Sequence, residues 1–337
     1  MMANLRAGLI GLGMMGRHHA RVIRALDGVD LVAVADPGGD PHNAAGDLDV
    51  LASVEAVTAV GIDYCIVAAP TDLHDEVGLA MADAGVHTMI EKPLAADIRR
   101  ARTLAEAFSK AGLVGAVGHI ERYNAALQSL RIRLEAGELG EVYQITTRRQ
   151  GPFPDRISDV GVVKDLATHD IDLTAWVAQQ PYVSVAARTV HKSGREHEDL
   201  VAVTGLLADG TVTSHLVNWL SPMKERVTVV TGERGTFVAD TLHADLTFHA
   251  NGIIPTEWDE IARFRGVTEG DMVRYAIAKP EPLRLEHEAF RDAVFGKTTD
   301  IVTMHQGLAT VVVAEAILES ASTGQTVNLA HDPSEPL

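Results

Sequence analysis

Several residue types are scarce in this chain of 337 residues, and each scarcity excludes something. Cys65 is the one cysteine, so no disulfide can form within the chain and nothing indicates secretion. No apolar run approaches the roughly 18 residues that a membrane-spanning helix needs. The apolar start, Leu5–Leu12, runs into glycines and a basic stretch rather than a small-residue cleavage site. We therefore expect no signal peptide and a cytoplasmic protein.

Positive charge is also scarce. Lys and Arg together number 29 against 46 Asp and Glu, which gives a formal net charge of −17 at pH 7. This balance disfavours nucleic acid and anionic membranes as partners, because both attract basic surfaces. It still allows a small anionic ligand that is held by a local group of arginines.

What the chain does have is enough apolar sequence for a large core, since 46% of its residues are apolar. Its length suggests two domains. In the first part, apolar runs typical of buried strands alternate with helical stretches. The strands are expected at Leu5–Leu12, Val29–Ala35, Ile62–Ala69, Val86–Ile90 and Leu113–Gly118, and the helices at Gly13–Leu26, Asp72–Ala84 and Asp97–Ala111. This alternation predicts an α/β domain over residues 1–120, with a doubly wound parallel sheet covered on both faces.

After residue 120 the pattern changes to strands separated by turns, with a few helices between them. The strands are expected at Val142–Arg149, Val183–Val190, Leu200–Leu207, Val212–Trp219, Arg226–Thr231 and Thr236–Ala239, and the helices at Tyr123–Ala136, Val163–Ala178, Leu283–Val294 and Gln306–Ser320. The pair Asp209-Gly210 is a strong hairpin signal. We therefore predict a second, α+β domain over residues 121–337, with an open, mostly antiparallel sheet.

A glycine-rich turn follows the first expected strand and opens the first expected helix. It reads Gly11-Leu12-Gly13-Met14-Met15-Gly16, a G-x-G-x-x-G pattern that in this context predicts a dinucleotide site. The first glycine permits a tight turn, the second lets backbone approach a pyrophosphate, and the third lets helix and strand pack closely. The helix N-terminus adds amide donors and a positive dipole end.

Asp36 ends the second strand, 20 residues after Gly16, where a carboxylate takes the adenosine ribose hydroxyls. The alternative is a structural glycine turn with a capping aspartate. Between Arg24 and Lys92 the sequence has no Lys or Arg, so a 2′-phosphate near Asp36 would meet a carboxylate and no local cation. The site is therefore expected to prefer NAD over NADP.

Polar residues follow two later strands, at the edge of a parallel sheet where ligands bind. Pro70, Thr71 and His74 come after one strand, and Glu91 and Lys92 come after the next. Lys92 precedes a proline, which fixes the local backbone and can follow a cis bond. The alternative for this lysine is a solvated turn residue.

Asp165, His169 and Asp172 recur at i, i+4 and i+7 on the helix expected over Val163–Ala178. They share one face, and a carboxylate one turn from an imidazole can tune or orient it. An exposed acidic helix face is the simpler interpretation in so acidic a chain. A metal site is a third, but Cys65 lies elsewhere and no HExxH pattern is present, so we expect no metal.

In this order, these motifs resemble the glucose–fructose oxidoreductase / inositol dehydrogenase (Gfo/Idh/MocA) family over essentially the whole chain. The matching pieces are GLGMMG, the strand-end Asp36, AAPTDLH, EKP, the strand ending VGH, and DLATHDID. The resemblance implies a Rossmann domain that binds NAD and an α+β domain whose open sheet usually forms an oligomer interface, so a homo-oligomer (a dimer or tetramer) is expected. It implies that Lys92, Asp165 and His169 are catalytic, and that Thr71, His74 and Glu91 line the nicotinamide side.

Within the family, GHIERYN and RRQGPFPDRISDVGVVKDLATHD resemble the branch that contains UDP-N-acetylglucosamine 3-dehydrogenases. Three arginines, Arg148, Arg149 and Arg156, lie before the expected catalytic helix, and arginine forks suit phosphate oxygens. Because neighbouring strand residues face opposite sides, only one of Arg148 and Arg149 can point into a cleft; we take Arg149. Phe153 lies between prolines and suits a sugar or base face. The alternative is a surface loop with ordinary ion pairs.

Tyr123 and Asn124 could hydrogen-bond sugar hydroxyls, or they could be a helix start with asparagine as the cap. Taken together, the sequence predicts an NAD-dependent dehydrogenase acting on a secondary hydroxyl of a sugar or sugar nucleotide. His169 would take the hydroxyl proton, Lys92 would hydrogen-bond the reacting oxygen, and Asp165 would orient Lys92 or His169. The alternatives are an inositol or free-sugar dehydrogenase and a non-catalytic NAD-sensing regulatory protein with the same fold.

Overall fold

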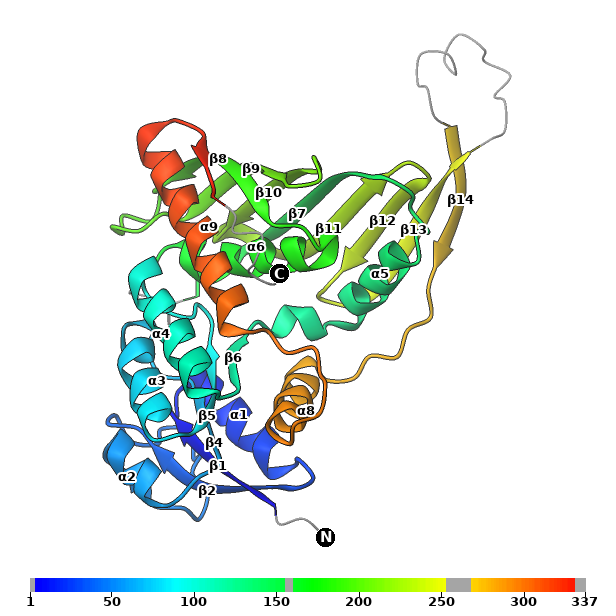
Figure 1. Ribbon diagram of the computed structural model, residues 1–337. Coiled ribbons are helices and arrows are strands. Elements are labelled where there is room, and N and C mark those ends of the chain that lie inside the picture. The colour runs from blue at the N-terminus through cyan, green and yellow to red at the C-terminus, as the bar shows by residue number, and fades with distance from the viewer. Residues whose placement is uncertain (1–3, 155–159, 253–267, 331–337) are drawn as a thin grey trace. The chain divides into compact units, whose positions relative to one another are not determined.

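The computed structural model describes residues 4–154, 160–252 and 268–330, and it divides into two compact units (Figure 1). One unit holds the chain up to Ile120 together with Pro280–Glu315, and the other holds Glu121–Lys279 together with the chain from Ala316. The break after Ile120 lies where the sequence predicts a domain boundary. The return of Pro280–Glu315 to the first unit differs from the prediction, which assigned all residues after 120 to the second domain.

The first unit is built on a six-stranded parallel sheet with the order β3-β2-β1-β4-β5-β6. Its strands are β1 (Leu5–Ile10), β2 (Val29–Ala35), β3 (Val50–Leu51), β4 (Tyr64–Val67), β5 (His87–Glu91) and β6 (Gly115–Gly118). The chain order reverses direction between β1 and β4, so the carboxyl ends of these two strands form the switch point at which doubly wound sheets bind ligands. The predicted parallel sheet is confirmed, and β3 is an additional short strand.

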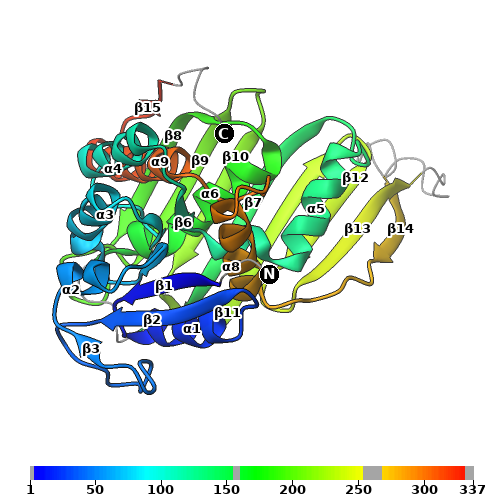
Figure 2. The ribbon, with the colours of Figure 1, turned by 60° about the horizontal axis from the view of Figure 1, so that its bottom comes forward.

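Helices cover both faces of this sheet (Figures 1 and 2). They are α1 (Met14–Arg24), α2 (Val54–Ala59), α3 (His74–Asp83) after the short 3₁₀ turn η1 (Thr71–Leu73), α4 (Ile98–Ala111), α8 (Pro282–Val294) and the first part of α9 (Met304–Thr323). Met81, Leu104 and Phe108 lie in the core on one face, and Leu9 and Ile23 lie in the core on the other.

The late helices belong to the first unit because their apolar residues complete its two cores. Phe290 of α8 packs edge-on against Tyr64 of β4, with 5.5 Å between the ring centroids. Met304, Leu308 and Val311 of α9 join the core that also holds Phe108. Without these residues the two faces of the parallel sheet would be incompletely covered.

The second unit is built on a nine-stranded sheet with the order β14-β13-β12-β11-β7-β10-β9-β8-β15. The strands are β7 (Val142–Pro152), β8 (Tyr182–Val190), β9 (Leu200–Leu207), β10 (Val212–Asn218), β11 (Leu220–Gly232), β12 (Gly235–Asp240), β13 (Asp245–Gly252), β14 (Thr268–Arg274) and β15 (Val327–Asn328). All recorded pairs are antiparallel except β7 with β10. The predicted mostly antiparallel sheet is confirmed.

Two helices lie over one face of this sheet, as Figure 1 shows: α5 (Ala125–Glu135), after the 3₁₀ turn η2 (Ile120–Tyr123), and α6 (Thr168–Ala178), after a π-helical turn labelled η3 (Val163–Ala167). Leu127, Leu173 and Trp176 pack there against the strand residues Val230 and Phe237. The helices therefore bury one side of β7, β11, β12 and β13 and leave the alternate residues for the other side.

The opposite face of the second sheet carries exposed apolar residues. Along β10, Thr213, His215 and Val217 are buried while Val212 is 46% and Leu216 is 39% exposed. Alternation of this kind is typical of a sheet with one covered face. No helix among the described residues meets the length and hydropathy criteria for a membrane span.

Candidate active site

The glycine-rich turn joins β1 to α1 and has the geometry of a dinucleotide cradle. Gly11 has a φ of +93°, and a Cβ there would lie 2.5 Å from the carbonyl carbon and oxygen of Ala68. A Cβ on Gly16 would lie 2.0 Å from the carbonyl oxygen of Gly11. These two glycines are therefore required by close contact between the helix and two strands.

The second glycine differs from its neighbours because it faces open space. A Cβ on Gly13 would meet no other atom within 4 Å, and Gly13 provides no side-chain cap for α1. The amides of the first turn of α1 therefore have no side-chain acceptor from the residue that caps them, and backbone is open to approach there. These residues fit a pyrophosphate at the helix N-terminus. Met14, at the first position of α1, is 43% exposed beside them.

Asp36 is held against this turn by two backbone amides. Its Oδ2 accepts from Leu12 N at 2.7 Å, and its Oδ1 accepts from Gly38 N at 2.7 Å. The capping interpretation of Asp36 is thus confirmed, and it is compatible with ribose binding because each carboxylate oxygen has a second lone pair. Arg24, the last cation before the gap, donates to the carbonyl of Ala45 at 2.6 Å.

His74 joins the ends of two neighbouring strands. Its Nδ1 lies 2.9 Å from the carbonyl oxygen of Pro93, and its Nε2 lies 2.9 Å from that of Ala69. The residue is 1% exposed, and burial lowers the pKa of its imidazole. A ring buried between two carbonyls holds the two loops together, and the expected contact of His74 with the cofactor stays a prediction. Thr71, which begins η1, is half-buried and keeps its expected place at this edge.

Glu91 and Lys92 end β5 at the same edge, and the peptide bond between Lys92 and Pro93 is cis. Oε2 of Glu91 accepts from the backbone N–H of Lys92 at 3.2 Å, and Oε1 lies 2.8 Å from Nε2 of His19. Burial acts to raise the pKa of Glu91, but the hydrogen bond to His19 and the charges nearby outweigh it and lower that pKa. Glu91 is therefore favoured as a carboxylate beside Lys92.

The helix that carries Asp165 and His169 begins with the π-helical turn η3. Val163 N donates to Oε1 of Glu198 at 2.9 Å, so a buried carboxylate caps the start of this turn. A Cβ on Gly161 would lie 2.1 Å from that carboxylate, so glycine is needed there. Asp165 is 7% exposed, and His169 is half-buried. Single π-helical turns inside α-helices are frequent at functional sites. The sequence predicted the helix but gave no sign of the turn or of Glu198.

Two aspartates of α6 are tied to buried arginines. Arg149 Nε donates to Oδ2 of Asp170 at 2.9 Å, and its NH1 donates to Oε1 of Glu121 at 2.8 Å. Arg122 forks onto Asp172 at 2.8 and 2.7 Å. Arg149 is 2% exposed, so the expectation that it binds substrate has to be corrected: its guanidinium is consumed by two carboxylates that position α6.

The neighbour of Arg149 has the opposite orientation. Arg148 is exposed on the other side of β7 and pairs with Glu225, which confirms that the two side chains diverge. Phe153 packs edge-on against Trp219, with 5.3 Å between the ring centroids, and the guanidinium of Arg195 lies 4.5 Å from the Phe153 centroid. Arg156, also expected to bind substrate, lies outside the described residues.

Tyr123 and Asn124 are both buried. Asn124 caps α5, because its Oδ1 accepts from Ala126 N at 3.0 Å and its Nδ2 donates to the carbonyl of Thr241 at 3.0 Å. The capping alternative is therefore confirmed for Asn124, while its contact with a sugar hydroxyl stays a prediction. Among the described residues, no group of three or more His, Cys, Asp or Glu side chains is arranged to hold a metal ion.

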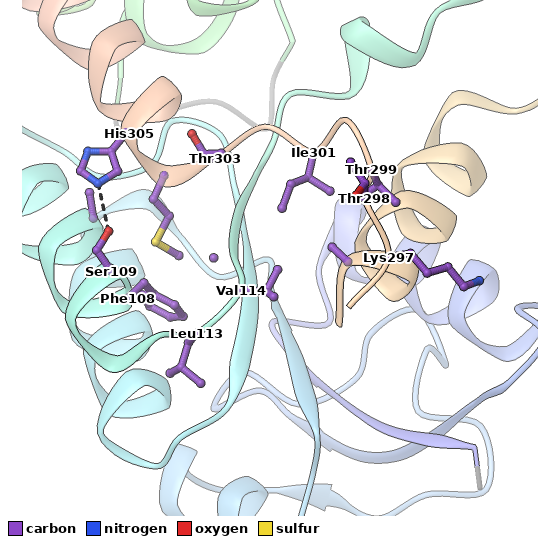
Figure 3. Close-up of a pocket in the computed structure, with 14 residues that line it drawn as sticks. Phe108, Ser109, Leu113, Val114, Lys297, Thr298, Thr299, Ile301, Thr303 and His305 are labelled. Carbon is purple, nitrogen blue, oxygen red and sulfur yellow. Dashed lines mark hydrogen bonds between the residues drawn. The ribbon is translucent and has the colours of Figure 1, made fainter. Parts of the chain in front are cut away.

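A cavity of about 370 Å³ in the first unit is not the cofactor site (Figure 3). Leu113, Val114 and Gly115 line it at the start of β6, whereas the glycine turn and Glu91 lie at the carboxyl ends of the parallel strands. Across the cavity wall, Ser109 Oγ lies 3.0 Å from Nε2 of His305.

Comparison with known proteins agrees with this geometry. Residues 5–119 match a model described as an oxidoreductase family with an NAD-binding Rossmann fold, and residues 131–329 match the α/β C-terminal domain of the same family. The UDP-N-acetylglucosamine 3-dehydrogenase of Acidithiobacillus ferrooxidans is 34% identical over 63% of this chain and 66% of its own, just under two thirds of its length. Its crystal structure superposes with a TM-score of 0.82 at 26% identity, covering 96% of this chain and 99% of that one.

A second relative matches over the whole length. The inositol 2-dehydrogenase 2 of Saccharopolyspora erythraea is 26% identical over 98% of this chain and 97% of its own. The two domain models together account for most of the sequence, in the order and with the boundary that the fold shows. The chain therefore belongs to the Gfo/Idh/MocA oxidoreductase family and carries its NAD-binding Rossmann domain and its C-terminal α/β domain.

Proposed function

We propose that the protein is an NAD-dependent dehydrogenase that oxidises a secondary hydroxyl of a sugar or sugar nucleotide. The observation that carries the proposal lies within the first unit: the open cradle at Gly13 and the Glu91-Lys92 pair lie at the same edge of one parallel sheet. A cofactor whose pyrophosphate binds the cradle extends along this edge. The relatives named as dehydrogenases of UDP-N-acetylglucosamine and of inositol support oxidation of a CH–OH group.

The side chains divide the reaction between them. When bound, NAD supplies the acceptor for the hydride that leaves the carbinol carbon. Lys92 hydrogen-bonds the reacting oxygen and stabilises the negative charge that develops on it. His169 removes the hydroxyl proton, and Asp165, one turn earlier, orients the base or balances the charge. In reduction of a ketone the same groups return the proton.

A screen of polyols, free sugars and UDP-sugars for NADH formation tests this function. Lys92→Met keeps most of the side-chain volume and removes the ammonium, so it is expected to lower kcat by roughly 10²–10⁴ for any substrate that the screen finds. Lys110→Met, at an exposed lysine in the last turn of α4, is the matched control and should turn over normally. Normal turnover by Lys92→Met would refute the assignment.

The substrate class divides into two candidates. The branch resemblance and the A. ferrooxidans relative support a UDP-sugar. The burial of Arg149 with Asp170 and Glu121 favours a neutral polyol, because it removes one of the cations expected to meet a diphosphate. For a UDP-sugar, Arg156→Ala should raise KM more than it lowers kcat, because remote phosphate binding is mostly uniform binding. Efficient turnover of inositol with no turnover of UDP-N-acetylglucosamine would select the polyol.

The exposed face of the second sheet supports a homo-oligomer. Leu206, Val212 and Leu216 are each more than a third exposed on neighbouring strands β9 and β10. Contiguous apolar area of this kind is typical of protein interfaces. Leu216→Glu should shift the protein to smaller species in sedimentation velocity, whereas a monomeric parent protein would refute the assembly.

A further inference from the structure

Three buried side chains from distant parts of the sequence form a hydrogen-bonded chain in the first unit. His19 of α1 and His287 of α8 are 0% and 1% exposed. Nδ1 of His19 lies 2.8 Å from Nε2 of His287, and Nε2 of His19 lies 2.8 Å from Oε1 of Glu91. Helices α1 and α8 lie side by side in Figures 1 and 2, so the hydrogen-bonded chain runs from His287 on α8 through His19 on α1 to Glu91 at the end of β5. These hydrogen bonds are separate from the close contacts at Gly11 and Gly16 that shape the glycine turn.

The unpaired Nδ1 of His287 fixes the direction in which these hydrogen bonds donate. Nδ1 of His287 is buried and has no hydrogen-bond partner among the residues that the structure describes. A proton on that nitrogen would be an orphaned buried donor, which proteins rarely contain. We therefore assign the proton of His287 to Nε2, from which it donates to His19. His19 then donates from its own Nε2 to Glu91, so every donor points toward the carboxylate.

The carboxylate at the end of this chain is held tightly. The side chain of Glu91 is 13% exposed, with Oε1 facing His19 and Oε2 accepting from Lys92 N. On the neighbouring strand β6, a Cβ on Gly118 would lie 3.2 Å from Cδ and 3.3 Å from Oε2 of Glu91. Contact this close is tighter than usual, so glycine at position 118 makes room for the carboxylate.

We propose that His19 and His287 are positioning residues for the dehydrogenase reaction, which hold Glu91 as a fixed, ionised carboxylate and through it keep Lys92 in place and aimed at the reacting oxygen. The inference rests on the role of Lys92 proposed above. The two histidines hydrogen-bond with each other and with Glu91, so any effect on the reaction passes through that carboxylate. The competing interpretation is that the histidine pair only fastens α8 onto α1. In that case, mutation of His287 would leave the pH dependence of the reaction unchanged.

The groups that interact electrostatically with Glu91 and with His287 can be named. Glu91 interacts with His19 from α1, with Lys92 after it in the sequence, and with His74 from the start of α3. His287 interacts with His19, and its burial lowers the pKa of its imidazole well below the usual range. His287 is therefore a neutral donor near pH 7. A change in the pH profile on mutation of His287 then reports on Glu91.

The first pair of variants separates hydrogen bonding from bulk. His287→Leu removes the donor to His19, and His287→Gln restores an amide N–H at about the same distance from the backbone. With myo-inositol or UDP-N-acetylglucosamine, whichever is turned over, His287→Leu should lower kcat about tenfold, or about 1.4 kcal/mol. The KM for NAD should change less than twofold, and His287→Gln should recover most of the rate.

The pH profile supplies the readout that a purely structural role would not move. With a weaker donor chain, Glu91 binds a proton more readily, so the loss of kcat on acidification should begin about one pH unit higher in His287→Leu. His87→Leu is the matched control. His87 lies at the other end of β5, where its Nδ1 accepts from Val114 N at 2.9 Å. The His87→Leu variant should have a lower melting temperature, and its kcat should fall at the same acidic pH as in the parent protein.

A double variant distinguishes failure of this inference from failure of the proposed function. If the chain acts through Lys92, adding His287→Leu to Lys92→Met should cause no further loss of residual rate. Two results overturn the positioning role: an unchanged fall of kcat at acidic pH in His287→Leu, or an equal loss of rate from His287→Leu with and without Lys92. In either case Lys92→Met still tests the catalytic role of Lys92. Full activity of Lys92→Met overturns the catalytic role of Lys92, and the positioning role with it. Absence of NADH formation by the parent protein with every substrate of the screen overturns the proposed function.

Discussion

The burial of Arg149 makes a prediction that separates a structural arginine from a substrate ligand. Arg149→Met keeps an unbranched side chain and leaves the carboxylates of Glu121 and Asp170, 9% and 3% exposed, without their main partner. Removing one member of a buried ion pair costs about 3–5 kcal/mol, because the remaining charge is neither solvated nor paired. For a domain of this size, that cost lowers the melting temperature by roughly 10 °C.

The pH dependence of this loss has a definite sign. In the folded protein, burial acts to raise the pKa of Glu121, but Arg149 outweighs it and lowers that pKa, so the group stabilises the fold above its unfolded pKa. Burial raises the pKa of Asp170 even with Arg149 present. Without the guanidinium, burial dominates for both groups, and both gain by taking up a proton. The stability gap between the parent protein and Arg149→Met should therefore shrink as the pH falls from 8 to 5.

Thermal unfolding followed by circular dichroism measures this gap, and two further variants test its cause. Arg148→Met removes the exposed neighbour on the same strand, whose surface pair with Glu225 is worth about 0–1 kcal/mol. Neutralising the carboxylates as well, with Glu121→Gln and Asp170→Asn, should recover much of the loss. If Arg149→Met melts like the parent protein but has a raised KM, the guanidinium serves the substrate and the reasoning is refuted.

Three further outcomes are expected. Exchanging Asp36→Ser together with Pro37→Arg should narrow a preference for NAD over NADP, and comparable kcat/KM for the two cofactors in the parent protein would contradict that preference. Lys92→Ala and His169→Ala should each lower kcat by roughly 10²–10⁴ with little change in NAD affinity by fluorescence titration; near-normal turnover in either would remove it from the mechanism. Gly161→Ala should lower both the melting temperature and kcat, because its Cβ would lie 2.1 Å from the carboxylate that caps η3; an unchanged melting curve would show that the turn does not need glycine.

The features that could be predicted from the sequence are those encoded within one strand, turn and helix. The glycine turn needs only residues 5–24, because β1, the three glycines and α1 follow one another directly. The strand-end residues Glu91 and Lys92 were found because parallel strands put their carboxyl ends at one edge. The boundary at Ile120 was visible as a change of period. Each of these signals is local, and the packing that surrounds it does not alter it.

The assignments that changed depend on partners that lie far away in the sequence. Strand alternation predicted that Arg148 and Arg149 diverge, but not which of them is buried. That choice follows from Glu121 and Asp170, which lie 28 and 21 residues away on other elements. His74 is expected at the cofactor because its neighbours lie there, and nothing in the sequence indicates that its ring lies between the carbonyls of Ala69 and Pro93.

The distribution of charge in the second unit bears on the substrate. Two buried arginines that meet α6 are neutralised within the protein, Arg122 by Asp172 and Arg149 by Asp170 and Glu121. In a chain with a net charge of −17, buried carboxylates thus compete for the few cations before any ligand arrives. A diphosphate could be bound only by cations outside this network, since taking one of its arginines would strand a buried carboxylate. A neutral polyol needs no cation for binding. Whether the protein binds a diphosphate therefore depends on arginines outside the ion-pair network that fixes α6.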